Sequence, residues 1–93
     1  MSAGNGRLAG RTALITGAAR GLGARIAKRM SEEGARVVIN DLNLAAARAT
    51  ADELGGEAVA CDVGDSAAVA AMFEEAVALV GDLDILVCNA GIS

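Results

Sequence analysis

The sequence predicts an α/β fold with one parallel sheet and helices on both of its faces. Four short apolar runs rich in β-branched residues alternate with three segments whose apolar residues recur at helical spacing. The connections between them are short and mostly contain glycine. This β-α-β-α-β-α-β alternation implies parallel strands joined by right-handed crossovers. In a doubly wound, Rossmann-like sheet the strand order is 3-2-1-4.

The first strand and helix are separated by a glycine-rich turn. Residues 12–16 are apolar and partly β-branched, which suits a strand buried on both faces. Leu22, Ile26 and Met30 then fall on one face of a helix, while the basic residues of this segment lie elsewhere. The segment 17–23 therefore connects a buried strand to an amphipathic helix.

The remaining elements follow in the same alternation. Gly34 stands at a plausible C′ position of the first helix, and Asp65 or Ser66 offers an N-cap for the third. Strands are expected at 36–40, 57–61 and 83–88, and helices at 43–54 and 67–80. With the order 3-2-1-4, Cys61 and Cys88 end strands about 14 Å apart, too far for a disulfide.

Composition limits the functions that the chain can have. Its 93 residues make one small domain, with residues 1–10 expected as a flexible lead. There is no histidine, so zinc binding and histidine-based catalysis are not expected, and no metal site is predicted. The net charge of −4 and the single aromatic residue argue against nucleic-acid binding. No run approaches the ~20 apolar residues of a membrane span, and we expect a cytoplasmic protein.

The charges are distributed unevenly around the glycine-rich turn. Residues 1–36 hold seven Arg or Lys against two Glu, whereas residues 37–93 hold one Arg against ten acids. This asymmetry can steer an anionic ligand toward the turn, although solvated helix faces explain Arg25, Lys28 and Arg29 equally well.

The glycine pattern Gly17-x-x-x-Gly21-x-Gly23 indicates a nucleotide-binding loop. Gly17 can adopt backbone angles closed to other residues, and Gly21 lets a ligand approach the main chain. Gly23 is explained by packing of the helix on the sheet. The helix N-terminus carries about half a positive charge and suits a pyrophosphate. Ordinary turn glycines remain the alternative for the pattern taken alone.

Further polar residues stand at the carboxyl ends of the other strands, where ligands bind in open α/β sheets. Asp41 can accept both hydroxyls of an adenosine ribose and would repel a 2′-phosphate. This favours NAD over NADP, while Arg20 argues in the opposite direction. A helix N-cap or a solvated loop acid is the alternative for Asp41.

The ends of the third and fourth strands complete this set. Asp62 can bond an adenine amino group while Val63 packs on the ring, or Asp62 is simply an acid near a helix start. Asn89 can satisfy backbone groups between neighbouring strands. Gly91 leaves room for a cofactor.

Together these motifs resemble the amino-terminal half of the short-chain dehydrogenase/reductase family. The resemblance rests on Thr16-Gly17-x-x-x-Gly21-x-Gly23, Asp41, Asp62-Val63 and Asn89-Ala90-Gly91. It implies an NAD(P)-dependent oxidoreductase acting on an alcohol or carbonyl, and a homo-oligomeric complete protein. The implied contacts are Arg20 and Leu22 with the pyrophosphate side, Asp41 with the adenosine ribose, Asp62 and Val63 with adenine, and Asn89, Ala90 and Gly91 with the nicotinamide ribose side.

Two departures from the family pattern bear on activity. Cys88 stands where the family more often has a second asparagine. The family's catalytic Tyr-x-x-x-Lys segment has no counterpart, since the chain contains no tyrosine. We therefore expect residues 11–93 to form a partial dinucleotide-binding domain that is inactive alone. The alternative is a stand-alone nucleotide-binding or interaction module, and continuation of the reading frame into a Tyr-x-x-x-Lys segment would decide against it.

Overall fold

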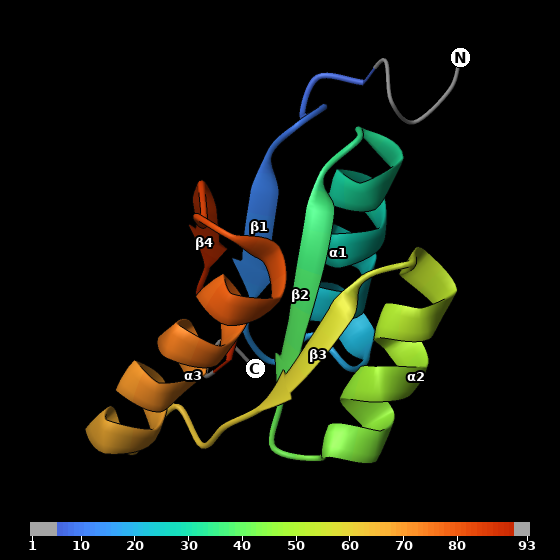
Figure 1. Ribbon diagram of the computed structural model, residues 1–93. Helices are drawn as coiled ribbons and strands as arrows, with labels where there is room; N and C mark the ends of the chain where they lie inside the picture. Colours follow the sequence, from blue (N-terminus) through green and yellow to red (C-terminus); the bar gives the residue numbers. More distant parts are fainter. Residues whose placement is uncertain (1–5, 91–93) are drawn as a thin grey trace.

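The computed structural model describes residues 6–90 and contains the predicted parallel sheet. All strand pairs are parallel and the order is β3-β2-β1-β4, which confirms the predicted 3-2-1-4 order (Figure 1). The elements are β1 (Thr12–Ile15), α1 (Gly21–Glu32), β2 (Arg36–Asp41), α2 (Leu44–Leu54), β3 (Glu57–Ala60), α3 (Ser66–Val80) and β4 (Ile85–Val87).

Alternate side chains of the strands enter two separate cores, because successive residues of a strand point to opposite faces. On β1, Ala13 and Ile15 belong to the core on the α1 and α2 side, whereas Leu14 belongs to the core under α3. Figure 1 shows α1 and α2 together on one side of the sheet and α3 on the other. The sheet is therefore the middle of three layers.

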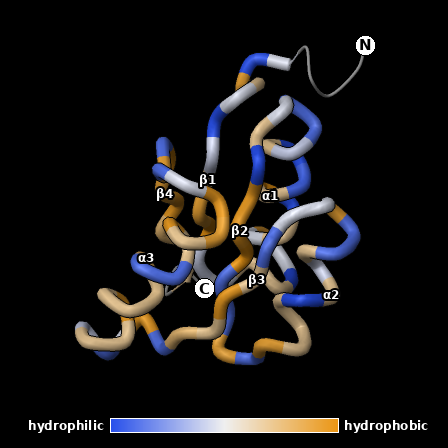
Figure 2. The backbone as a smooth tube through the Cα atoms, viewed as in Figure 1, coloured by the Kyte–Doolittle hydropathy of each residue, from blue (hydrophilic) through white to orange (hydrophobic). Residues whose placement is uncertain are grey.

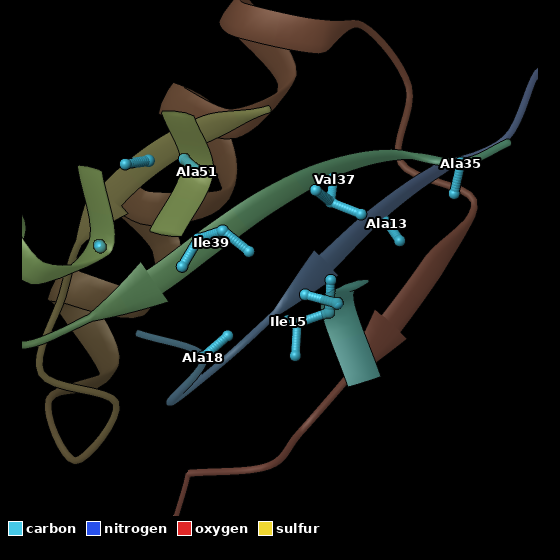
Figure 3. Packing of buried hydrophobic residues seen from close by; sticks show 10 residues of the cluster. Ala13, Ile15, Ala18, Ala35, Val37, Ile39 and Ala51 are labelled. Atoms are coloured by element: carbon cyan, nitrogen blue, oxygen red, sulfur yellow. The ribbon is translucent and has the colours of Figure 1, made fainter. Parts of the chain in front are cut away.

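The core beneath α1 and α2 is built largely from small residues. Ala27 of α1 and Ala47 and Ala51 of α2 are fully buried against the β1 and β2 side chains that Figure 3 shows. Since alanine adds little volume, both helices lie close to the sheet. The central strands β1 and β2 carry buried apolar residues on both faces, as expected for strands in the middle of a parallel sheet, and Figure 2 shows the hydrophobic stretch in β2.

The opposite face is covered by α3 alone. Met72 and Ala76 pack on Leu14 and Val59, but Leu86 of β4 remains 48% exposed. The incomplete cover follows from the strand order, because α3 packs beside β3 while β4 lies at the other edge of the sheet.

Residues 6–10 change the expected start of the folded region. They form a turn against the carboxyl end of α1, where the Leu8 amide donates to the Glu33 carbonyl at 2.7 Å and the Arg7 amide to Glu33 Oε1 at 3.1 Å. Leu8 also packs against the core under α1 and α2. The half-buried Leu8 side chain thus attaches residues that the composition had assigned to a flexible lead.

Candidate functional site

The loop after β1 is held in place by the end of β2. The Ala18 amide donates to the Asn40 carbonyl at 2.9 Å, and the Gly17 amide lies 3.4 Å from Asn40 Oδ1. Asn40 is almost completely buried, and its Nδ2 donates to the carbonyls of Val59 and Cys61. This one side chain therefore connects the loop with the ends of three adjacent strands.

Asp41 and Thr50 hold the next residue of the loop. The Ala19 amide donates to Asp41 Oδ2 at 3.4 Å, and Thr50 Oγ1 of α2 donates to the Ala19 carbonyl at 2.6 Å. The other oxygen of Asp41 accepts from the Asn43 amide at 3.2 Å. Asn43, and not Asp41, caps α2, so the helix-cap alternative for Asp41 is wrong.

The end of β4 closes the loop from the opposite side. Thr16 is buried, and its Oγ1 accepts from the Ala90 amide at 3.1 Å. Asn89 Nδ2 donates to the Gly17 carbonyl at 3.0 Å, which is the bridging role between strand ends that its sequence position suggested. These two bonds bring the fourth strand end to the loop, as the parallel order requires.

The three glycines of the loop are required for different structural reasons. Gly17 and Gly21 have φ of +60° and +63°, values that favour glycine strongly. A Cβ on Gly21 would meet no heavy atom within 4 Å, so its α-carbon faces open space. A Cβ on Gly23 would collide with the Gly17 carbonyl and lie 2.6 Å from Asn89 Nδ2. Gly23 is thus a packing glycine, but it packs on the loop and not on the sheet as expected.

The N-terminus of α1 differs from those of the other helices. Side chains cap α2 and α3, through Asn43 and Asp65, whereas Arg20 at the N-cap of α1 makes no side-chain cap bond. The first turn of α1, like those of α2 and α3, contains no acidic residue. Since the first amides of a helix have no partners within it and carry partial positive charge, this end fits an anionic group such as a diphosphate.

A hollow of about 270 Å³ lies at the carboxyl edge of the sheet between the ends of β1, β2, β3 and β4. The segments that follow all four strands contribute to its lining. The lining residues are Gly17, Asn40, Asp41, Leu42, Cys61, Asp62, Val63 and Ala90. A second hollow of about 310 Å³ shares Val63 and Ala90 with it and extends toward α3 and β4. The two adjoining hollows offer an elongated crevice for an extended ligand.

Asp62 and Val63 present different chemistry to this crevice. Asp62 Oδ1 accepts from the Gly64 amide at 2.8 Å, which forms a turn before α3, and the residue remains exposed. Val63 is 42% exposed at the same edge. An acid and an exposed apolar side chain thus stand side by side, as binding of an adenine would require.

The structure brings most, but not all, of the predicted residues to one place. Gly17, Asp41, Asp62, Val63 and Ala90 line the same hollow, and Asn89 contacts Gly17. The start of α1 is exposed at Arg20, Gly21 and Leu22, whereas the next residue, Gly23, is buried. Gly91 lies outside the described residues.

Sequence reasoning missed Asn40 and Thr50 as supports of the loop. A buried asparagine at the end of a β-branched run is a usable signal, because a polar side chain in such a place must find hydrogen-bond partners. Thr50 has no comparable signal. Its contact depends on how α2 lies beside the loop, which local sequence does not specify.

Comparison with known proteins identifies the family from this same set of elements. A sequence model of the family described as short chain dehydrogenase matches residues 11–93. This chain belongs to the short-chain dehydrogenase family. The matched residues include every strand and helix that the structure describes and all residues that line the two hollows.

The chain matches part of the length of three longer relatives. It is 48% identical over 94 residues to 2-dehydro-3-deoxy-L-rhamnonate dehydrogenase (NAD(+)) of Sphingomonas sp. (strain SKA58), covering 100% of this chain and 38% of the relative. A hydroxysteroid dehydrogenase structure from Escherichia coli shares 43% identity with a TM-score of 0.83, covering 91% and 38% of the two chains. A metagenomic short-chain oxidoreductase in complex with NADP shares 42% identity with a TM-score of 0.77, covering 88% and 39%.

These relatives bear on chemistry as well as on fold. They are oxidoreductases, one named for NAD and one solved with NADP, so the family uses nicotinamide cofactors. This chain spans less than two-fifths of the length of each of the three. Among residues 6–90, no helix is both long and apolar enough to cross a bilayer.

The two cysteines of the short-chain dehydrogenase chain are both free and stand in different surroundings. Cys61 is buried and Cys88 is exposed. Burial raises the pKa of the Cys61 thiol, and the nearby carboxylates of Asp62 and Asp65 raise it further. The neutral thiol of Cys61 is therefore favoured over the reactive thiolate.

We expect iodoacetamide to modify Cys88 much faster than Cys61 in the native chain. Only the thiolate reacts, and a raised pKa together with burial lowers its amount and its access at Cys61. The raised pKa has a second consequence. Folded Cys61 keeps its proton at a pH where the thiol of the unfolded chain has lost it, so the free energy of unfolding falls as the pH rises through this range. Peptide mass spectrometry of the alkylated chain measures both rates. Equal rates in native buffer would contradict the prediction, and urea should make them similar.

Proposed function

We propose that residues 11–93 form the cofactor-binding half of an NAD-dependent short-chain dehydrogenase acting on an alcohol or carbonyl compound. The observation that carries the proposal is the uncapped N-terminus of α1 beside the Asp41 carboxylate, at one edge of the sheet. A positive helix end and a hydroxyl acceptor are the two groups that an adenosine diphosphate requires.

The described residues fit the parts of this cofactor. The α1 amides, with Arg20 and Leu22 at the start of the helix, would hold the pyrophosphate, and Gly21 leaves its approach open. Asp41 would accept the ribose hydroxyls. Both of its oxygens already accept one backbone amide, but a carboxylate has about four acceptor positions, so capacity remains.

The remaining crevice residues would hold the two ends of the molecule. Asp62 and Val63 would contact the adenine, and Asn89, Ala90 and Gly91 the nicotinamide ribose side. When bound, the nicotinamide accepts or donates the hydride of the oxidoreduction. The residues of this chain bind and orient it, and we propose no catalytic residue among them.

We propose NAD as the preferred cofactor because Asp41 is acidic and stands where a 2′-phosphate would come close. Arg20 is the basic residue that would favour NADP, but it lies at the start of α1 and does not line the hollow that contains Asp41. The carboxylate of Asp41 would repel a 2′-phosphate by its like charge, and this is the reason for the proposed preference for NAD. For the complete protein we further propose a cytoplasmic homo-oligomer.

Binding without turnover is the expected result for the 93-residue chain. Calorimetric titration should show one NAD site per chain, and nicotinamide mononucleotide should bind far more weakly because it lacks the adenosine that Asp41, Asp62 and Val63 contact. No reduced nicotinamide should form when NAD and simple secondary alcohols are added. Absence of NAD binding would refute the proposed function, and measurable turnover would refute the proposed inactivity.

A further inference from the structure

Thr50 makes a contact that neither its helix nor the core requires. Its side chain is half-buried, and Oγ1 donates to the Ala19 carbonyl of the glycine-rich loop at 2.6 Å. A threonine within a helix commonly bonds a carbonyl one turn earlier in the same helix. Here the hydroxyl instead bonds a loop that is 31 residues earlier in the chain.

The stability of α2 has other sources than this bond. Asn43 caps its start, Gly55 in a left-handed conformation ends it, and Ala47 and Ala51 bury its inner face. Thr50 is thus not needed to form the helix. Its hydroxyl acts on the loop.

The bond determines the direction of one peptide group in the loop. The peptides of the described chain are trans, and in a trans peptide the C=O and the following N–H point in opposite directions. Because Thr50 holds the Ala19 carbonyl toward α2, the Arg20 amide points away from α2. Asp41 holds the Ala19 amide at the same time, so both polar groups of Ala19 are fixed immediately before α1 begins.

We propose that Thr50 is a positioning residue for the diphosphate site at the N-terminus of α1. Its hydroxyl fixes the Ala19–Arg20 peptide and thereby the direction of the Arg20 amide at the N-cap. Preorganised amides bind an anion more tightly, because less conformational freedom is lost on binding. The inference rests on the proposed function, since it assigns a support to the same cofactor site.

The test compares Thr50→Val with Thr50→Ser by calorimetric titration with NAD and with ADP. Valine keeps the branched shape and removes the hydroxyl, whereas serine keeps the hydroxyl. Thr50→Val should raise the Kd of both ligands about 3- to 10-fold, the effect of one hydrogen bond. Thr50→Ser should stay within about twofold of the parent chain. Thr50→Ala, with a better helix former, serves as the second hydroxyl-free variant if the valine variant does not fold.

Ser31→Ala is the matched control. Ser31 Oγ of α1 donates to the Leu54 carbonyl of α2 at 3.4 Å, so it too is a hydroxyl-to-carbonyl bond to the backbone of another element, but it does not involve the loop. This variant should leave the Kd for NAD unchanged. Urea midpoints for all variants separate a loss of fold from a loss of binding.

The outcomes separate this inference from the proposed function. If the parent chain does not bind NAD, both are overturned. If the parent binds and a folded Thr50→Val or Thr50→Ala variant binds equally well, only the role of Thr50 is overturned. The same holds if Thr50→Ser is as weak as Thr50→Val, or if Ser31→Ala weakens binding to the same extent.

Discussion

Replacing Asp41 by alanine should weaken NAD binding by about 10- to 100-fold, the range expected when hydrogen bonds to a charged acceptor are lost. The carboxylate is the acceptor that we assign to the ribose hydroxyls. It also fixes the Ala19 amide in the loop. NADP affinity should fall less, or rise, because the like charge opposing a 2′-phosphate disappears.

Two further variants make the Asp41 test specific. Asp41→Asn keeps the shape and one acceptor but loses the charge, so it should reduce the preference for NAD more than it reduces NAD affinity. Asp52→Ala removes the same charge from an exposed position of α2 and should leave both affinities unchanged. Equal affinity of the unmutated chain for NAD and NADP, measured by calorimetric titration, would defeat the argument from Asp41.

Gly23→Ala should destabilise the fold, although helix propensity alone predicts the opposite. Alanine is favoured over glycine within a helix by about 1 kcal/mol. At this position, however, the new methyl group would collide with the Gly17 carbonyl and approach Ala18 Cα to 2.9 Å. Backbone atoms cannot turn away as a flexible side chain would. Overpacking of this kind costs roughly 1–3 kcal/mol, and urea unfolding followed by circular dichroism measures it.

Loss of NAD binding should accompany the loss of stability in Gly23→Ala. The collision also involves the Asn89 amide that donates to Gly17, so relief of strain moves the loop. Gly21→Ala is the comparison, because its methyl group meets no heavy atom within 4 Å and only the positive φ costs energy, roughly 1–2 kcal/mol. If Gly23→Ala is as stable as the parent chain, the loop accommodates the methyl group and the predicted collision is wrong.

The elements of the fold were predictable because they depend on local pattern. Alternation of strand and helix periods, with glycine at helix ends, implied the parallel sheet and its order, and the structure confirms both. Element boundaries differ by at most two residues. The fourth strand is the largest case, expected at 83–88 and observed as Ile85–Val87. An edge strand pairs on one side only, so fewer of its residues are held in the ladder.

The candidate site was only partly predictable. Strand-end positions are a consequence of topology, so the meeting of Gly17, Asp41 and Asp62 at one edge followed from the predicted order. The supports of the loop did not follow, because Asn40 and Thr50 act through side-chain contacts across elements. The packing partner of Gly23 was wrong for the same reason.

The amino-acid pattern thus specified the sheet, its strand order and the sheet edge that we propose for nucleotide binding. These depend on hydrophobic periodicity and on turn residues, which are properties of short segments. Contacts between elements far apart in the chain establish how the loop is held and place Gly23 against the Gly17 carbonyl. They also leave α1 as the one helix of residues 6–90 without a side-chain cap. Hydrogen bonds and collisions of this kind depend on distances of a few tenths of an ångström between segments far apart in the chain.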